Sequence, residues 1–188
     1  MVVGFIVEGA TEKIIIESLQ FREFLNAIEL NYIEDIIDAK GAGNLLPYEL
    51  KGHVKQLSRK GAEIIVILTD LQPSASIEDV QNRVNPNGNH VVAVAVQQIE
   101  AWLLADIQVM KIFLDDQDFQ IAHPESYENP FNEINNLRIQ RNQLKVKTKP
   151  VLAQKIISEG FDVRRAAAHP GCASARYFIN ILTEISQR

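Results

Sequence analysis

The 188-residue chain has one cysteine, one tryptophan and four histidines, and it has no apolar run of the length that crosses a membrane. The single cysteine, Cys172, excludes an internal disulfide and favours a reducing compartment. With so few thiols and imidazoles there is no ligand set of the zinc type, so any metal would be held mostly by oxygen. A membrane span needs roughly 20 apolar residues, and no basic segment precedes the first apolar run. We therefore expect a cytoplasmic protein with no membrane span and no secretory signal.

Charge is distributed unevenly along the chain, whose formal net charge is −5. Residues 138–176 carry nine Lys or Arg side chains and two carboxylates, whereas residues 1–137 carry nine basic and 21 acidic side chains. A basic segment on an acidic body indicates a polyanionic partner near that segment. The alternative is a solvated face that balances its acidic neighbour, and the charge pattern does not separate the two.

The first stretch of the chain combines a buried strand with two carboxylates. The continuous apolar run from Val2 to Val7 is typical of a parallel strand that is buried on both faces. Glu8 follows it directly, Gly9 suits a tight turn, and Thr11 is a candidate N-cap for a helix. Glu12 would then lie in the first helical turn, where a carboxylate also complements the helix dipole. Glu8 has no such explanation, because a glutamate at the end of a buried strand is costly unless it is paired.

The rest of the chain alternates strand and helix, which predicts an α/β fold with a parallel sheet. Further strands are expected at residues 32–39, 62–70 and 90–96. Helices are expected at residues 11–28, 44–60, 76–84, 100–114, 149–160 and around 177–185. We predict a Rossmann-like, four-stranded sheet in the order 2-1-3-4, with helices on both sides. Residues 1–188 would form a single domain, with a core over about 1–114 and a loop-rich, helical extension over about 115–188.

Three carboxylates fall at or just past the carboxyl ends of predicted strands: Glu8, Asp70 and Glu100. Ligands of open α/β sheets bind at that edge, and converging carboxylates cannot all stay ionised without a cation. Oxygen ligands favour Mg²⁺ or Mn²⁺, and such a site suits phosphodiester cleavage. Asp106 is a weaker candidate, since six residues on a helix turn it away from Glu100; a surface or capping role is the more common one for such an Asp.

A Gly-x-Gly sequence at Gly41–Gly43 follows the second predicted strand. Such a sequence can cradle a phosphate, but without a third glycine it is more often a plain turn.

Two short motifs resemble the signatures of the Toprim domain, the catalytic module of topoisomerases, bacterial primases and overcoming-lysogenization-defect (OLD) nucleases. They are residues 7–12 (Val-Glu-Gly-Ala-Thr-Glu) and residues 67–72 (Ile-Leu-Thr-Asp-Leu-Gln). Residues 97–106, which include Glu-Ala-Trp-Leu-Leu-Ala-Asp, and the pattern from Lys149-Pro150 to residues 174–178 resemble a bacterial Toprim-like family of unknown function. The resemblance spans nearly the whole chain.

The resemblance implies a Toprim fold in which Glu8 and Asp70 hold a divalent metal, with Glu12 and Glu100 nearby. The usual Asp-x-Asp of the second motif is here Asp-Leu-Gln, so Gln72 replaces the second acid. A Gln carbonyl can coordinate a metal but adds no charge, so metal affinity and activity should fall unless Glu100 substitutes.

The leading hypothesis is therefore a metal-dependent nuclease in bacterial defence or DNA processing. Glu8, Asp70, Gln72 and Glu100 would hold Mg²⁺ or Mn²⁺, and Glu12 would be a further ligand or base. Nucleic acid is the expected partner, together with a partner protein such as an ATPase encoded nearby. The rivals are a non-catalytic module that binds nucleic acid or protein and a binder of a small phosphorylated metabolite. The expected phosphate contacts are Lys147, Lys149, Arg164, Arg165 and Arg176, of which Lys149 and Arg176 are preferred.

Overall fold

The chain folds around a parallel sheet, in a computed structural model that describes residues 1–71, 74–88 and 90–188. Its long strands are β1 (Val2–Val7), β4 (Ile64–Asp70) and β5 (Val91–Ala95). Two short strands, β2 (Asn31–Tyr32) and β3 (Ile37–Asp38), both pair with β1. The order is β2-β1-β4-β5 and every pair is parallel. The predicted α/β class and parallel sheet are confirmed.

The expected second strand is two strands, so the sheet has five strands and not four. β2 lies beside the start of β1 and β3 lies beside its end. Between them the chain bends at Glu34, whose carbonyl accepts a hydrogen bond of 3.1 Å from the Ile36 amide. The adjacent Asp35 carboxylate accepts hydrogen bonds from Gln56 and from Lys60. This local hydrogen bond replaces a ladder bond to β1, and apolar periodicity alone does not reveal it.

Both faces of the sheet are buried, as the continuous apolar runs predict. Side chains alternate between two apolar clusters because successive residues of a strand point to opposite faces. The larger cluster takes Val3, Phe5, Val7, Val66, Leu68, Ala93 and Ala95 from the sheet. The smaller cluster takes Ile6, Ile37, Ile65, Ile67, Val92 and Val94.

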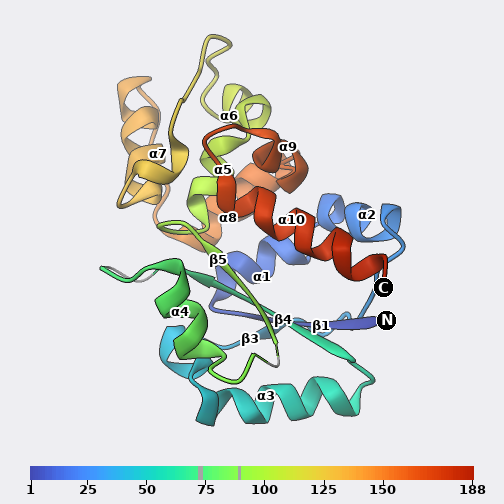
Figure 1. Cartoon of the computed structure of the whole chain (residues 1–188). Helices are drawn as coiled ribbons and strands as arrows, with labels where there is room; N and C mark the ends of the chain where they lie inside the picture. The colour runs from blue at the N-terminus through green and yellow to red at the C-terminus, as the bar shows by residue number, and fades with distance from the viewer. Residues whose placement is uncertain (72–73, 89) are drawn as a thin grey trace.

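The two faces are covered very unequally (Figure 1). The smaller cluster lies under α3 (Pro47–Arg59) and α4 (Ile77–Val84), the second of which begins with a capping box at Ser76. The larger cluster is covered by helices from both ends of the sequence. These are α1 (Ala10–Ile16), α2 (Leu19–Ala27), α5 (Glu100–Ala105), α8 (Lys149–Ser158), α9 (Val163–Ala168) and α10 (Ala173–Ser186).

The helix expected over residues 11–28 is interrupted. α1 ends at Ile16, and the Ser18 hydroxyl then caps α2 by accepting a hydrogen bond from the Phe21 amide. The same hydroxyl donates to the Ile15 carbonyl, so it closes one helix and opens the next. The helix also begins earlier than expected: Gly9 is its N-cap, and Thr11 lies inside the first turn. The spacing of apolar residues does not reveal this break, because both helices bury their apolar residues against the same cluster.

The helix expected over residues 100–114 is also two helices. α5 ends at Ala105, and Asp106 caps α6 (Ile107–Phe113) by accepting from the Val109 amide. Further along, residues 115–142 have no clear apolar period, yet they contain a short 3₁₀ turn (Pro124–Ser126) and α7 (Pro130–Gln140). The cap that starts α7, Asn129 followed by Pro130, is a helix signal that apolar spacing does not report.

The helices expected at Lys149-Pro150 and around Tyr177 are present as α8 and α10. α8 ends just before Gly160, which adopts a φ of +96°. Aromatic rings join α10 to α2 and to α5. The ring centroid of Phe178 lies 5.8 Å from that of Phe21 and 5.3 Å from that of Trp102. Residues 115–188 therefore share one apolar core with the strands.

Across residues 1–71, 74–88 and 90–188, none of the helices combines the length and the hydropathy needed to cross a bilayer.

Candidate carboxylate site at the sheet edge

Glu8 is fixed at the end of β1 by the neighbouring strand. Its amide donates to the Leu68 carbonyl over 2.9 Å, so the strand ladder continues one residue past β1. Its carboxylate accepts hydrogen bonds from the Thr69 hydroxyl and, over 3.1 Å, from the Asp70 amide. The half-buried Glu8 is thereby held against the end of β4 with one carboxylate oxygen already bonded.

Asp70 is the last residue of β4, and it joins the strand to the segment before α5. Its Oδ1 accepts a hydrogen bond of 2.8 Å from the Ile99 amide. Burial raises the pKa of Asp70 well above its ordinary value, and the charges of Glu12, Glu100 and Glu8 raise it further. Lys149 opposes these effects. A free carboxylate at this position is therefore unfavourable without more positive charge nearby.

Glu12 projects from the first turn of α1 and is only 4% exposed. Burial raises its pKa from 4.5 to about 7. A hydrogen bond to its backbone amide lowers the pKa, while the charges of Glu8 and Glu100 raise it. Glu12 therefore exchanges a proton near neutral pH, as a general acid or base must.

Glu100, the first residue of α5, is fully buried and pairs with Lys149, the first residue of α8. The Lys149 ammonium donates to Glu100 Oε2 over 3.1 Å. Burial raises the pKa of Glu100, and Lys149 offsets part of this rise. The other oxygen, Oε1, is buried without a hydrogen-bond partner among the described residues. Such an orphaned acceptor is costly in a protein interior, and an ordered water or a bound cation would satisfy it.

Gly41 closes the site from the side of β3. It adopts a φ of +120°, which side-chain-bearing residues rarely adopt, and its amide donates to the Glu8 carbonyl over 2.7 Å. The Gly-x-Gly turn therefore fixes the backbone of Glu8.

These residues meet around one cavity of about 270 Å³. Glu8, Glu12, Asp70 and Glu100 all line it, together with Lys149. The four carboxylates singled out from the sequence are thus brought together, and Lys149 is the one basic side chain among the described lining residues. Lys149 was expected to contact phosphate, but its ion pair with Glu100 was not foreseen. Thr69 was missed as well, although a hydroxyl just before the carboxylate of an apolar strand is a usable signal.

Of the remaining acidic and amide candidates, only Asp106 lies within the described residues, and it does not line this cavity. Gln72 lies outside the described residues. Asp106 is fully buried, and its carboxylate forms a two-pronged pair with the Arg165 guanidinium over 2.8 and 2.7 Å. It also accepts from the Asp162 amide, so both of its oxygens are bonded. Asp106 therefore caps α6, which was the alternative to a role as a metal ligand.

The basic candidates separate into two groups. Arg164 and Arg165 are paired with Asp162 and Asp106. The side chains of Lys147 and Arg176 are exposed and make no hydrogen bond or ion pair with the described residues. The second group and Lys149 are therefore the side chains available to an external anion.

The donor set suits a hard divalent cation in chemistry and charge. Four carboxylates face one ammonium group, and Glu100 Oε1 has no partner within the described chain. No three His, Cys, Asp or Glu side chains of residues 1–71, 74–88 and 90–188 are, however, arranged as a ready-made ligand set. Mg²⁺ is commonly bound by one or two carboxylates together with water and substrate phosphate. The residues therefore fit a cation that is completed by water or substrate.

Comparison of the chain with protein-family models, with curated proteins and with solved structures finds no significant match.

Proposed function

We propose that the chain is a divalent-metal-dependent enzyme of phosphodiester chemistry, a Toprim-like nuclease that acts on DNA or RNA. The observation that carries this proposal is the excess of buried carboxylate over positive charge at the edge of the sheet. Glu12, Asp70 and Glu100 all have raised pKa values, and Lys149 offsets only part of their charge. A divalent cation would remove this excess.

Glu8 and Asp70 would hold Mg²⁺ or Mn²⁺, with Glu12 and Glu100 beside them. Such a metal, when bound, acts as a Lewis acid and lowers the pKa of a water molecule that attacks phosphorus. The Thr69 hydroxyl and the Asp70 amide both donate to Oε2 of Glu8. These two bonds fix the orientation of the carboxylate, and therefore the direction of its other oxygen, Oε1.

Two side chains would handle proton and charge during cleavage. Glu12, with a pKa of about 7, would accept or return a proton at neutral pH. Lys149, whose side chain is 36% exposed, would contact a phosphate oxygen while its ammonium still faces Glu100. The exposed Lys147 and Arg176 would contact phosphates of the flanking backbone.

A non-catalytic module that keeps the fold and binds nucleic acid or protein is the second candidate. Two observations favour it: Gln72 stands where the motif usually has an acid, and no three potential ligands in the described residues form a complete metal set. In this case nucleic acid or protein binding would persist without any cleavage.

Calorimetric titration with MnCl₂ separates the two candidates at the metal step. Wild type should bind Mn²⁺, Glu8→Gln should lose that binding, and Glu23→Gln on the exposed surface of α2 should retain it. Cleavage of labelled single-stranded and duplex DNA and of single-stranded RNA should then need Mg²⁺ or Mn²⁺ and be lost in Glu8→Gln. Unchanged Mn²⁺ binding in Glu8→Gln would remove the basis of the enzyme proposal. Mn²⁺ binding without cleavage of any substrate would favour the module.

The phosphate contacts are tested by the dependence of oligonucleotide affinity on salt. Lys147→Ala should reduce the slope of log affinity against log salt by about one, because one phosphate contact is lost. Arg22→Ala, on the exposed surface of α2, is the matched control and should leave the slope unchanged. Equal slopes for wild type and both variants would mean that residues near Lys147 do not contact nucleic acid.

A further inference from the structure

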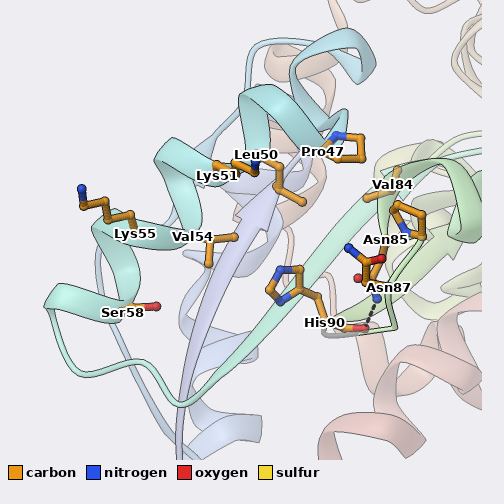
Figure 2. Close-up of a pocket in the computed structure, with 11 residues that line it drawn as sticks. Pro47, Leu50, Lys51, Val54, Lys55, Ser58, Val84, Asn85, Asn87 and His90 are labelled. Atoms are coloured by element: carbon orange, nitrogen blue, oxygen red, sulfur yellow. Dashed lines mark hydrogen bonds between the residues drawn. The ribbon is translucent and has the colours of Figure 1, made fainter.

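A second cavity lies on the other face of the sheet, far from the carboxylates in the fold. It has a volume of about 430 Å³ and is bordered by α3 on one side and by residues 84–87 and His90 on the other (Figure 2). It shares no residue with the carboxylate cavity. Its size is in the range of sites that hold small molecules. Nothing in the proposed nuclease chemistry uses it.

The floor of this α3 groove is apolar. Leu50 and Val84 are buried members of the smaller apolar cluster, and Val54 packs against that cluster. Pro47 and Pro86 complete the apolar lining at the two sides. A hydrocarbon or ring surface that entered the groove would lose its contact with water against this floor, which favours binding.

The rim of the groove is cationic. Lys51 and Lys55 lie one helical turn apart on α3, and both are exposed. Figure 2 shows the Lys55 side chain extended away from Val84 and His90, so its ammonium group has to swing round to reach a ligand in the groove. Neither ammonium group forms a hydrogen bond or ion pair with the described residues. The lining residues that are described include no carboxylate, although the chain as a whole has a net charge of −5. The groove is therefore a local site for an anion on an acidic protein.

Polar groups also reach the groove from its two walls. Figure 2 shows the His90 imidazole directed between α3 and the opposite wall, with Ser58 and Asn87 at the border. The Asn85 amide is already used, because it donates to the His90 carbonyl over 2.6 Å and holds the loop closed. A hydroxyl and an amide beside an apolar floor suit the polar edge of a heterocyclic ring.

We propose that the α3 groove binds a nucleotide, with its phosphate at Lys51 and Lys55 and its base on the apolar floor. The shared chemistry is an anionic phosphate joined to a flat ring, and it has two sources: a free mononucleotide or one unit of a single strand. Lysine binds phosphate as a mobile point charge, so the two ammonium groups need no fixed geometry before the ligand arrives. The proposal does not depend on the metal or on cleavage.

The test is a titration of ¹⁵N-labelled protein with 2′-deoxyadenosine monophosphate in EDTA, followed by amide NMR shifts. Saturable shifts should cluster at Lys51, Lys55, Ser58 and Asn87. The charge reversal K51E/K55E should weaken binding at least about tenfold, because it replaces two charge-assisted phosphate contacts with repulsion between like charges. Shifts confined to the carboxylate site, or no saturable shift at all, would overturn the proposal.

A steric variant and a charge control complete the set. Ser58→Trp fills the groove from an exposed position without removing charge, so it should also abolish binding. Arg22→Glu changes an exposed cation on α2, away from the groove, and should bind like wild type. If Ser58→Trp does not fold, as judged by circular dichroism, K51E/K55E decides alone, because both of its positions are exposed. Unchanged affinity in K51E/K55E would sink the proposal.

Component ligands then test the two halves of the site. Deoxyadenosine without phosphate and inorganic phosphate without a base should each bind at least about tenfold more weakly than the nucleotide. If deoxyadenosine binds as tightly as the nucleotide, the lysines do not hold the phosphate and the assignment is wrong. A 12-residue oligodeoxyadenylate that shifts the same amides more strongly would identify a strand as the source, and a weaker response would identify the free nucleotide.

Discussion

Glu12→Gln tests directly whether buried charge at the sheet edge is costly in the metal-free protein. The pKa of Glu12 is raised from 4.5 to about 7 by burial. Because the folded protein holds this proton more tightly than the unfolded chain, the stabilisation is complete below about pH 4.5. It is lost as pH rises through about 7. At pH 8 the folded protein therefore carries a charge whose cost the unfolded chain avoids.

The size of this cost follows from the pKa values. A pKa difference of one corresponds to 1.36 kcal/mol, so a rise from 4.5 to about 7 corresponds to on the order of 3 kcal/mol. Glu12 is only 4% exposed, so solvent screens little of it. The charge of Glu12 also raises the pKa of Asp70, so the two carboxyl groups share the cost of the buried charge. Glutamine keeps the shape of the side chain and removes the charge, so we expect Glu12→Gln to be more stable than wild type at pH 8 by up to about this amount.

The assay is urea unfolding in EDTA at pH 8 and at pH 4, followed by circular dichroism. The excess stability of Glu12→Gln should be present at pH 8 and should disappear at pH 4, where wild type is protonated. Glu23→Gln, at an exposed position on α2, should match wild type at both pH values. With Mn²⁺ present, wild type should gain more stability than Glu12→Gln. A variant that is equally or less stable than wild type at pH 8 in EDTA would refute the argument that Glu12 carries an uncompensated charge.

Four further substitutions are predicted, all measured by urea unfolding. Lys149→Met should lower stability at pH 8 by roughly 1–2 kcal/mol, a modest value because the ammonium is partly exposed; the loss should vanish at pH 4, and a persistent loss would mean packing rather than charge. Asp106→Asn should cost roughly 2–3 kcal/mol by breaking a buried ion pair, yet leave Mn²⁺ affinity unchanged; lost affinity would move Asp106 into the site. Gly171→Ala would place Cβ 2.3 Å from the Ala122 carbonyl oxygen and should cost roughly 2–3 kcal/mol. In contrast, Gly52→Ala meets open space within α3 and should gain roughly 0.5–1 kcal/mol, so equal effects for the two glycines would contradict the contact argument.

The edge of the sheet could be predicted because its signals are local. Each of the two long strands that reach the site is a continuous apolar run, and each ends at a carboxylate, Glu8 or Asp70. Parallel pairing then brings those ends together. Strand order and direction group Glu8, Asp70 and Glu100, and the first turn of the following helix adds Glu12.

The breaks within helices could not be predicted from apolar spacing. Ser18 and Asp106 each end one helix and cap the next, while the apolar face continues through the break. Ser18 caps through local partners alone, the Phe21 amide and the Ile15 carbonyl, whereas Asp106 is also held by Arg165 from another helix. Helix α7 was missed for the opposite reason: its cap is clear, but its apolar face is weak.

The pairing of Glu100 with Lys149 was out of reach for a different physical reason. The two residues are 49 positions apart in the sequence, and each is the first residue of its helix. The position of each helix is set by its other, apolar side chains. An ion pair of this kind depends on how helices meet over the larger apolar cluster. The sequence shows nine basic residues within residues 138–176, but it does not show which of them faces the carboxylates.

The hydroxyl of Ser174 has a consequence for how the chain is made on the ribosome. It accepts hydrogen bonds from the Val96 amide and from the buried Trp102 indole, and it donates to Glu125. Val96 is synthesised 78 residues before Ser174, which at 5–20 residues per second is roughly 4–16 s. During this interval the indole N–H and the apolar side of β5 have no cover from α10. A nascent chain that is cut short before residue 174 would thus expose the centre of the protein, and it would be a substrate for chaperones or proteases rather than a shorter folded protein.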